Sequence, residues 1–421
     1  MLSQYNDVVW RPLSDSERGV SSSEGDTPLV IEPLKSSSVS FLHEFLQSHS
    51  AQIRAALVRH GALLIRGFDV TSSRDFEQTI LRIRGMSGMS ELLLSEPGRT
   101  LADGTQFVFH TNSLVKTGGT TVFDDFHSEN YFAPDVPRYV SFFCLTPSTL
   151  GGETGLINLR KLYVDLPESV KAMLEERACF VARYALADME CRYGLRTEAI
   201  EKFCAEVGLS ALSVKARRYV AVYKPSVIRH PVTHDKVLLL NFLNIPGLRK
   251  ALLREFLPDY RGHEWLKHRL TWRLPLIYGL VHPDGVLRTL YRRVLRGAAQ
   301  KAGSKAYLLM DDARLAGSFF SASDVQLLAR SMRHRYSSFL WKRGDVLILD
   351  NLQLAHAGMP GQGKRNLRVM LCNPVSLPYS EASAGLHRID EVSETPMTLG
   401  ARLLELSQRE TPLSTAGGRS W

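Results

Sequence analysis

The residues best suited to chemistry are a histidine and a glutamate two positions apart, His127 and Glu129, in the run H-S-E. On a strand, residues i and i+2 project from the same face, so the imidazole and the carboxylate would converge on one point. Two histidines and one carboxylate form the facial triad of non-haem iron sites, which leaves three coordination positions open. The same spacing recurs at 282–284, but the proline and the turn found there exclude a paired strand.

A second histidine would have to come from a distant strand, and His356 is well placed for this role. It lies just beyond an apolar strand expected at 346–349, where a side chain can face a pocket. Arg365 and Arg368 follow nine and twelve residues later. An arginine binds a carboxylate in bidentate fashion, which would suit an acidic cosubstrate. Because side chains alternate along a strand, at most one of the two arginines should point inward.

In this order the motifs resemble those of the iron(II)/2-oxoglutarate-dependent oxygenases, and more closely the taurine dioxygenase-like and clavaminate synthase-like branch. Four motifs carry the resemblance: H-S-E at 127–129, G-G-E-T at 151–154, the stretch from G-D at 344–345 through D-N at 350–351 to His356, and R-N-L-R at 365–368. The resemblance covers roughly residues 29–374, apart from a basic segment at 249–305.

The resemblance implies that His127, Glu129 and His356 bind Fe(II). It also implies that Thr154 and Arg365 bind the cosubstrate 2-oxoglutarate, with Arg368 in reserve for the distal carboxylate. The reaction implied is oxidative decarboxylation of 2-oxoglutarate to succinate and carbon dioxide, coupled to oxidation of a substrate. Glu129 disfavours halogenation, because the halogenases of the family carry a small residue at this position.

The sequence departs from the family pattern in two places. Relatives often read H-G-R at the distal histidine, whereas this chain has H-A-G at 356–358, so an expected arginine is missing. The number of residues between Glu129 and His356 is also larger than is usual in the family, because the basic segment lies between them. Four polar residues near the first ligands are candidates for the substrate pocket, with surface or core packing as the alternative: His110, Asn112, Asn130 and Tyr131.

The elements that must position these residues belong to an α+β fold. The chain has 421 residues, of which 44% are hydrophobic and 23% charged, so a sizeable core can form and global disorder is excluded. The resemblance implies a double-stranded β-helix (jelly-roll) core with flanking helices and a helical insertion. Apolar periodicity predicts helices at 39–49, 73–84, 166–177 and 324–335, the last capped by Ser323, and strands at 62–68, 140–145, 237–242, 346–349 and 365–371.

We expect a polar leader at 1–27, the oxygenase core at 28–248 and 306–380, a basic helical insertion at 249–305 and a C-terminal extension at 381–421. The insertion holds 13 basic and four acidic residues, a difference equal to the chain's whole net charge of +9. Such a segment can bind phosphates, an anionic membrane surface or an acidic protein, or it can be a solvated helical surface. Few aromatic residues interleave its arginines, which disfavours nucleic acid.

Other classes of protein lack support. Five scattered cysteines without a C-x-x-C pair argue against a disulfide framework and a thiolate zinc site. No apolar stretch approaches the roughly 20 residues of a membrane span, and no secretory signal is visible. The run from 358 to 365 lacks the Ser or Thr of a phosphate-binding loop. We therefore expect a soluble, cytoplasmic protein.

The sequence thus predicts a non-haem iron(II)/2-oxoglutarate-dependent dioxygenase that uses dioxygen. The expected substrate is a small polar molecule, such as an amino acid or a carrier-bound aminoacyl group of specialised metabolism, and the expected outcome is hydroxylation. An acidic carrier protein docking on 249–305 would present such a substrate. The alternative is a non-catalytic jelly-roll binding protein that docks an acidic partner through the same segment. The substrate itself is not determined by the sequence.

Overall fold

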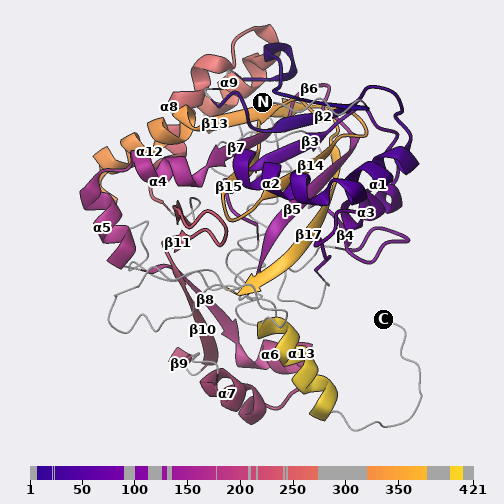
Figure 1. Cartoon of the computed structure of the whole chain (residues 1–421). Helices are drawn as coiled ribbons and strands as arrows, with labels where there is room; N and C mark the ends of the chain where they lie inside the picture. The colour runs from indigo at the N-terminus through magenta and orange to yellow at the C-terminus, as the bar shows by residue number, and fades with distance from the viewer. Residues whose placement is uncertain are drawn as a thin grey trace.

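The computed structural model describes residues 7–20, 22, 24–89, 100–111, 126–129, 135–176, 178–206, 210–214, 217–239, 242, 245–273, 320–376 and 399–410 (Figure 1). Two sheets with an apolar layer between them form the centre of the fold, and helices cover their outer faces. The expected α+β class is confirmed.

The larger sheet has seven strands in the order β1-β2-β3-β14-β5-β17-β4. Neighbouring strands are antiparallel except for β2 and β3, which are parallel. Most of its pairings join segments far apart in the chain, so the sheet forms only when both halves of the sequence come together. In chain order, its strands are β1 (Val8–Arg11), β2 (Leu29–Pro33), β3 (Ala62–Ile65), β4 (Val108–His110), β5 (Asp135–Thr146), β14 (Val346–Asp350) and β17 (Asn366–Ser376).

The smaller sheet pairs β13 (Tyr336–Phe339) and β15 (Leu354–Gly358) on either side of β7 (Thr154–Asn158). A short pair of strands, β6 (Leu150–Gly151) and β16 (Gly361–Gln362), lies next to it in sequence. Between the two sheets, alternate side chains of both meet in one buried apolar cluster. Members of this inner layer include Phe109, Val140, Phe142, Leu156, Phe339, Leu347, Leu354 and Val369.

Helices complete the core on both outer faces. The outer face of the larger sheet is covered by α1 (Val39–Ser48), α2 (Ser50–His60) and α3 (Ser73–Leu81), whose apolar sides bury Leu42, Ile53 and Phe76 against it (Figure 1). The outer side of the smaller sheet is covered by α4 (Leu159–Asp165), α5 (Glu168–Glu176), α8 (Leu248–Phe256) and α12 (Ala322–His334).

A third layer lies at the lower end of Figure 1, around the sheet β8-β10-β9. It joins the main body through the cluster that also covers the smaller sheet, and a hairpin of two short strands lies between them. Its elements are β8 (Ala178–Ala185), α6 (Leu186–Tyr193), α7 (Thr197–Glu206), β9 (Ser210–Val214), β10 (Arg217–Pro225) and α13 (Leu399–Glu410), and the hairpin is β11 (Val227–Arg229) with β12 (Lys236–Leu238).

The helices expected at 39–49, 73–84 and 166–177 are confirmed, as are the strands expected at 140–145, 346–349 and 365–371. The strands expected at 62–68 and 237–242 are shorter, since β3 ends at Ile65 and β12 ends at Leu238. The cap expected for α12 is wrong. Ser321, not Ser323, accepts the hydrogen bond from Asp324 N, and the carboxylate of Asp324 accepts one from Ser321 N in return. Aspartate can therefore close a capping box as glutamate does.

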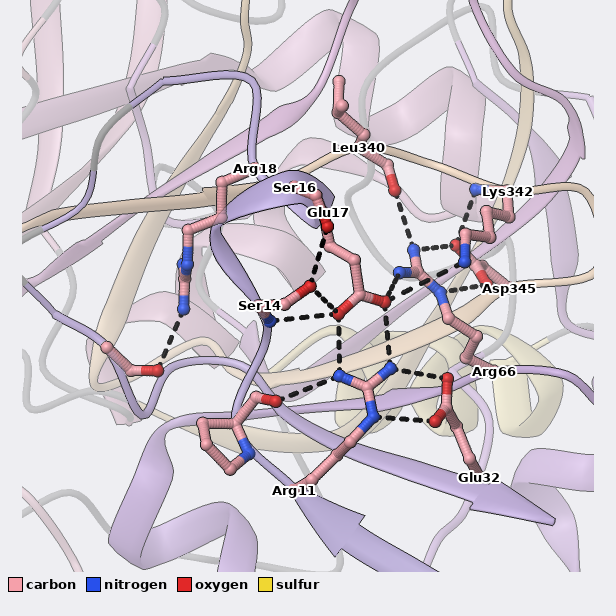
Figure 2. Close-up of polar contacts among 12 residues, drawn as sticks. Arg11, Ser14, Ser16, Glu17, Arg18, Glu32, Arg66, Leu340, Lys342 and Asp345 are labelled. Carbon is pink, nitrogen blue, oxygen red and sulfur yellow. Dashed lines mark hydrogen bonds and ion pairs between the residues drawn. The ribbon is translucent and has the colours of Figure 1, made fainter. Parts of the chain in front are cut away.

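Residues 8–20 of the expected polar leader form part of the body, because β1 pairs with β2 and both Val8 and Trp10 are buried. A buried charge network fixes this segment (Figure 2). Arg66, only 2% exposed, donates to both carboxylate oxygens of Asp345 at 3.0 and 2.6 Å and to Glu17 at 2.7 Å. Hydrogen bonds from Arg11, followed by those from neighbouring groups, hold the pKa of Glu17 far below its usual range. Asp345 of the G-D motif is therefore structural.

The described part of the expected insertion is helical and packs firmly on the smaller sheet's outer side. After α8 come two short 3-10 turns, Leu257–Asp259 and His263–Trp265, and then α9 (Leu266–Arg273). The ring of Phe256 contacts Tyr336 with centroids 4.9 Å apart, and Arg333 pairs with Asp259 at 3.0 Å. Residues 274–305 lie outside the described residues. None of the helices described is long and apolar enough to cross a membrane.

Candidate metal centre

The two histidines meet through their backbones, although 229 positions separate them in the chain. His127 N donates to His356 O at 3.1 Å, and His356 N donates to His127 O at 2.9 Å, which makes an isolated antiparallel bridge. His356 lies on β15 directly opposite Leu156 of β7, so its side chain projects into the apolar layer between the sheets. The distance between the two imidazoles is thus set by main-chain hydrogen bonds.

Glu129 completes a compact three-residue cluster. Its Oε2 lies 3.8 Å from His127 Nε2 and 3.6 Å from His356 Nε2, and one ligand atom from each residue fits within 4.8 Å of the others. Glu129 and His356 are buried, whereas the side chain of His127 is 27% exposed. Two imidazoles and one carboxylate are the donor set of a non-haem iron site, so the residues fit the metal that the sequence implied. The three residues that the sequence predicted to converge do lie together in the structure.

Aromatic side chains pack against His356 and around Phe126, the residue that precedes His127. Phe142 of β5 presents a T-shaped contact to the ring of His356 with centroids 5.2 Å apart. Phe126, which precedes His127, is fully buried against Phe256 and Tyr336. The first of these contacts keeps the inner side of the cluster apolar, and the second fixes the segment that carries His127 to the helical layer.

The G-G-E-T motif forms a tight turn that leads into β7. Gly151 and Gly152 have positive φ values of 57° and 66°, and a Cβ on Gly151 would lie 2.6 Å from Pro360 O. Only glycine adopts this backbone conformation readily and fits where there is no room for a Cβ. Thr154 follows, buried in the inner layer, where its Oγ1 accepts a hydrogen bond from Trp341 Nε1 at 3.0 Å.

Arg365 lies beside this turn and donates to Gly152 O at 2.6 Å. Burial lowers its pKa, with Cys144 and Glu153 acting in the opposite direction. Among the described residues no carboxylate lies within ion-pair distance of its guanidinium. A half-buried arginine held by a carbonyl and lacking a carboxylate is suited to receive an anionic group.

Arg368 lies on the other face of the larger sheet. It pairs in register with Phe143 of β5 and His110 of β4, and Phe143 belongs to the cluster under the outer helices. Its Nη1 donates to Asn366 Oδ1 at 2.7 Å. Partners in register share a face, so His110 also points away from the metal cluster, and the structure does not bring it to the pocket. Asn112, Asn130 and Tyr131 lie outside the described residues.

Two buried residues of the motifs, Glu153 and Asn351, had no role assigned in the sequence prediction. Glu153 is 1% exposed, and burial raises its pKa to about 7. The hydroxyl of Tyr260, from the expected insertion, donates to its Oε1 at 3.4 Å. Asn351 contacts the backbone of Glu129. The D-N pair at 350–351 was a visible motif, but nothing in the sequence indicated which segment its amide would reach.

Comparisons with known proteins show which family the sequence is similar to. The model of the family described as "Taurine catabolism dioxygenase TauD, TfdA family" matches residues 31–269, a stretch that includes His127 and Glu129 and ends before His356. The chain is 24% identical to the dapdiamide synthesis protein DdaC of Enterobacter agglomerans over 363 residues, which is 84% of this chain and 92% of that protein.

Among solved structures, PvcB of Pseudomonas aeruginosa is similar, with a TM-score of 0.44, 16% identity and coverage of 88% of this chain and 93% of that one. A taurine dioxygenase from Burkholderia xenovorans gives a TM-score of 0.44 at 15% identity, with coverage of 95% and 99%.

The chain therefore belongs to the TauD/TfdA family of dioxygenases. Enzymes of this family use Fe(II) and 2-oxoglutarate, and the three clustered side chains match that requirement. The protein is an iron(II)/2-oxoglutarate-dependent dioxygenase, which acts on a small molecule with dioxygen as the oxidant.

Proposed function

We propose that His127, Glu129 and His356 hold the catalytic Fe(II), and that the two sheets around them are the halves of a double-stranded β-helix. The observation that carries this proposal is the convergence of the three side chains within 4.8 Å at the inner layer of the fold. The chain contributes the donor set, an apolar environment formed by Phe142 and Leu156, and one accessible side at His127. A substrate would approach the centre from that accessible side.

We further propose that Arg365 binds the distal carboxylate of 2-oxoglutarate, with Thr154 beside it. The half-buried guanidinium without a carboxylate among the described residues supports this role, since an anion would offset its desolvation. The hydrogen bond to Gly152 O orients the guanidinium before the cosubstrate arrives. Iron(II) with 2-oxoglutarate supplies the activation of dioxygen that oxidises the substrate. The role of the chain is to hold the metal and 2-oxoglutarate in place and to keep water away from them.

The substrate proposed is a small polar molecule, such as an amino acid or a carrier-bound aminoacyl group, and the proposed outcome is hydroxylation in specialised biosynthesis. The name of the relative DdaC, a dapdiamide synthesis protein, supports a biosynthetic role.

An acidic carrier protein is the partner that the described part of the segment 249–305 would suit. Its α9 exposes Leu266 at 54% and Leu270 at 44%, with Lys267 and Arg273 exposed beside them. A mixed apolar and basic face of this kind is complementary to an acidic helical partner. Changing Lys267 and Arg273 to Gln should weaken carrier binding in a salt-dependent way while turnover of free substrate survives.

The test of the metal and cosubstrate sites is anaerobic titration of the full chain with Fe(II) and 2-oxoglutarate, followed by the weak visible absorption band of the complex. We expect the band to be lost in His127→Ala. We expect Arg365→Ala to weaken 2-oxoglutarate binding at least tenfold, because it removes a charge-assisted contact. Arg368→Ala is the matched control, since it removes the same kind of side chain from β17, at a position that pairs in register with Phe143 of the outer cluster, and it should keep wild-type affinity.

Two results would contradict the proposal. A wild-type chain that gives no band and retains no metal would exclude the iron site. Equal losses in Arg365→Ala and Arg368→Ala would exclude a specific role for Arg365. Succinate release with candidate substrates then identifies the molecule that is oxidised.

A further inference from the structure

We infer that Asn351 is a positioning residue for the ligand Glu129, which it holds by clamping the backbone of that residue from both sides. Asn351 Oδ1 accepts a hydrogen bond from Glu129 N at 2.6 Å, and Asn351 Nδ2 donates to Glu129 O at 3.0 Å. The same Nδ2 donates to Pro137 O at 2.8 Å. This inference rests on the proposed function, since it takes Glu129 to be a metal ligand.

The clamp gives Glu129 the two backbone hydrogen bonds that a partner strand would otherwise make. The backbone of His127 is fixed by its bridge to His356, but Glu129 lies in a turn beyond that bridge. A side-chain amide that pairs with both the N–H and the C=O of one residue makes the same two bonds as an antiparallel partner. The direction of the Glu129 carboxylate therefore depends on a side chain 222 positions away.

The amide of Asn351 is itself fixed by the turn that follows β14. Asn351 is fully buried, and its own N–H donates to Arg138 O at 2.8 Å. The preceding Asp350, also fully buried, accepts from His230 Nε2 at 3.0 Å and from Leu352 N at 3.1 Å. His230 Nδ1 accepts from two backbone N–H groups, so its proton is on Nε2, facing Asp350.

This turn also leads directly into β15, the strand of His356. One short segment, 350–353, therefore sets the position of two of the three proposed ligands, one through the chain and one through the Asn351 amide. Groups that orient metal ligands from outside the coordination sphere typically change metal affinity 10- to 100-fold when they are removed. A residue that only filled space would not have this effect.

The chain offers a matched control in Asn373. Its Oδ1 accepts from Ser87 N at 3.2 Å and its Nδ2 donates to Gly85 O at 2.7 Å, so it also joins two distant segments through both ends of an amide. It lies on β17 and contacts none of the three clustered residues among its described hydrogen bonds. Asn373 has a positive φ of 53°, a backbone conformation that strains alanine. Asn373→Ala should therefore lose stability through the backbone as well as through its two hydrogen bonds, which makes it a demanding control for Asn351→Ala.

The experiment measures the binding of Mn(II) alone to the full-length chain by calorimetry, together with the melting temperature of each metal-free variant. We expect Asn351→Ala to bind Mn(II) 10- to 100-fold more weakly than wild type, and Asn373→Ala to stay within twofold at a similar loss of melting temperature. Asn351→Asp keeps the acceptor for Glu129 N but loses both donated bonds, so its affinity should lie between those of wild type and Asn351→Ala.

Wild-type affinity in Asn351→Ala, or a loss in both alanine variants that follows their melting temperatures, would overturn the inference. If Asn351→Ala does not fold, Asn351→Asp decides the matter, and Mn(II) affinity equal to or tighter than wild type overturns the inference. Glu129→Ala separates the two levels of the argument. If wild type binds Mn(II) and Glu129→Ala does not, an unaffected Asn351→Ala refutes only the positioning role. If wild type itself fails to bind, the proposed metal centre fails with it.

Discussion

The carboxyl group of Glu153 should make the protein less stable as the pH rises, and Glu153→Gln should remove that dependence. Burial raises the pKa of this group from an ordinary 4.5 to about 7 in the folded protein. Between these two values the folded chain keeps a proton that the unfolded chain has released, so the free energy of unfolding falls with rising pH. At 1.36 kcal/mol per pKa unit, the loss between pH 5 and pH 8 is about 2.5 kcal/mol.

The measurement is urea unfolding of wild type, Glu153→Gln and Glu44→Gln at pH 5 and pH 8. Glu44 is exposed on α1, so its variant should keep the pH dependence of wild type. The free energy of unfolding of Glu153→Gln should change less than that of wild type between the two pH values, by about 2.5 kcal/mol. An identical change in wild type and Glu153→Gln would refute the reasoning. It would mean that the carboxyl group finds solvent or a charged partner.

Two further predictions concern stability. Gly19→Ala should lower the free energy of unfolding by about 1–3 kcal/mol, because the new Cβ would lie 2.8 Å from the buried Glu153 carboxylate. Gly25→Ala is the control, since its Cβ meets nothing within 4 Å, and it should stay within about 0.5 kcal/mol of wild type. Equal effects of the two changes in chemical unfolding would disprove the contact. Asp345→Asn should lower the free energy of unfolding by about 3 kcal/mol, because it leaves the buried charge of Arg66 poorly compensated. Asp7→Asn, in an exposed ion pair, should lower it by no more than about 1 kcal/mol. Similar losses in the two variants would count against the buried network.

Local patterns in the sequence were sufficient for most of the central elements. The run at 346–349 is wholly apolar between turn residues, and it forms the buried strand β14. The helix over 39–49 was equally clear from its apolar spacing. The spacing of His127 and Glu129 predicted a convergent pair, which the structure confirms, although Glu129 lies in a turn rather than on a strand. These features depend on residues close together in the chain, where periodicity and turn chemistry decide the outcome.

The features that escaped prediction depend on partners far apart in the chain. Residues 8–11 were assigned to a polar leader, yet they pair with β2, and Arg66 joins Glu17, a few residues further on, to Asp345. Nothing local distinguishes Arg365 from Arg368, because the alternation of the strand is known only once its pairing with β5 is known. The clamp of Asn351 on Glu129 spans 222 positions and leaves no local signal.

The backbone bridge between His127 and His356 has a consequence for how freely the chain between them can grow. Formation of the bridge closes a loop of roughly 230 residues, and the entropy of closing a loop rises only with the logarithm of its length. Lengthening the loop from roughly 170 residues by a segment the size of 249–305 therefore adds only about 0.3 kcal/mol. Once the bridge is long-range, further residues within the loop cost almost nothing, so additional structure can accumulate between the two histidines while their distance stays fixed.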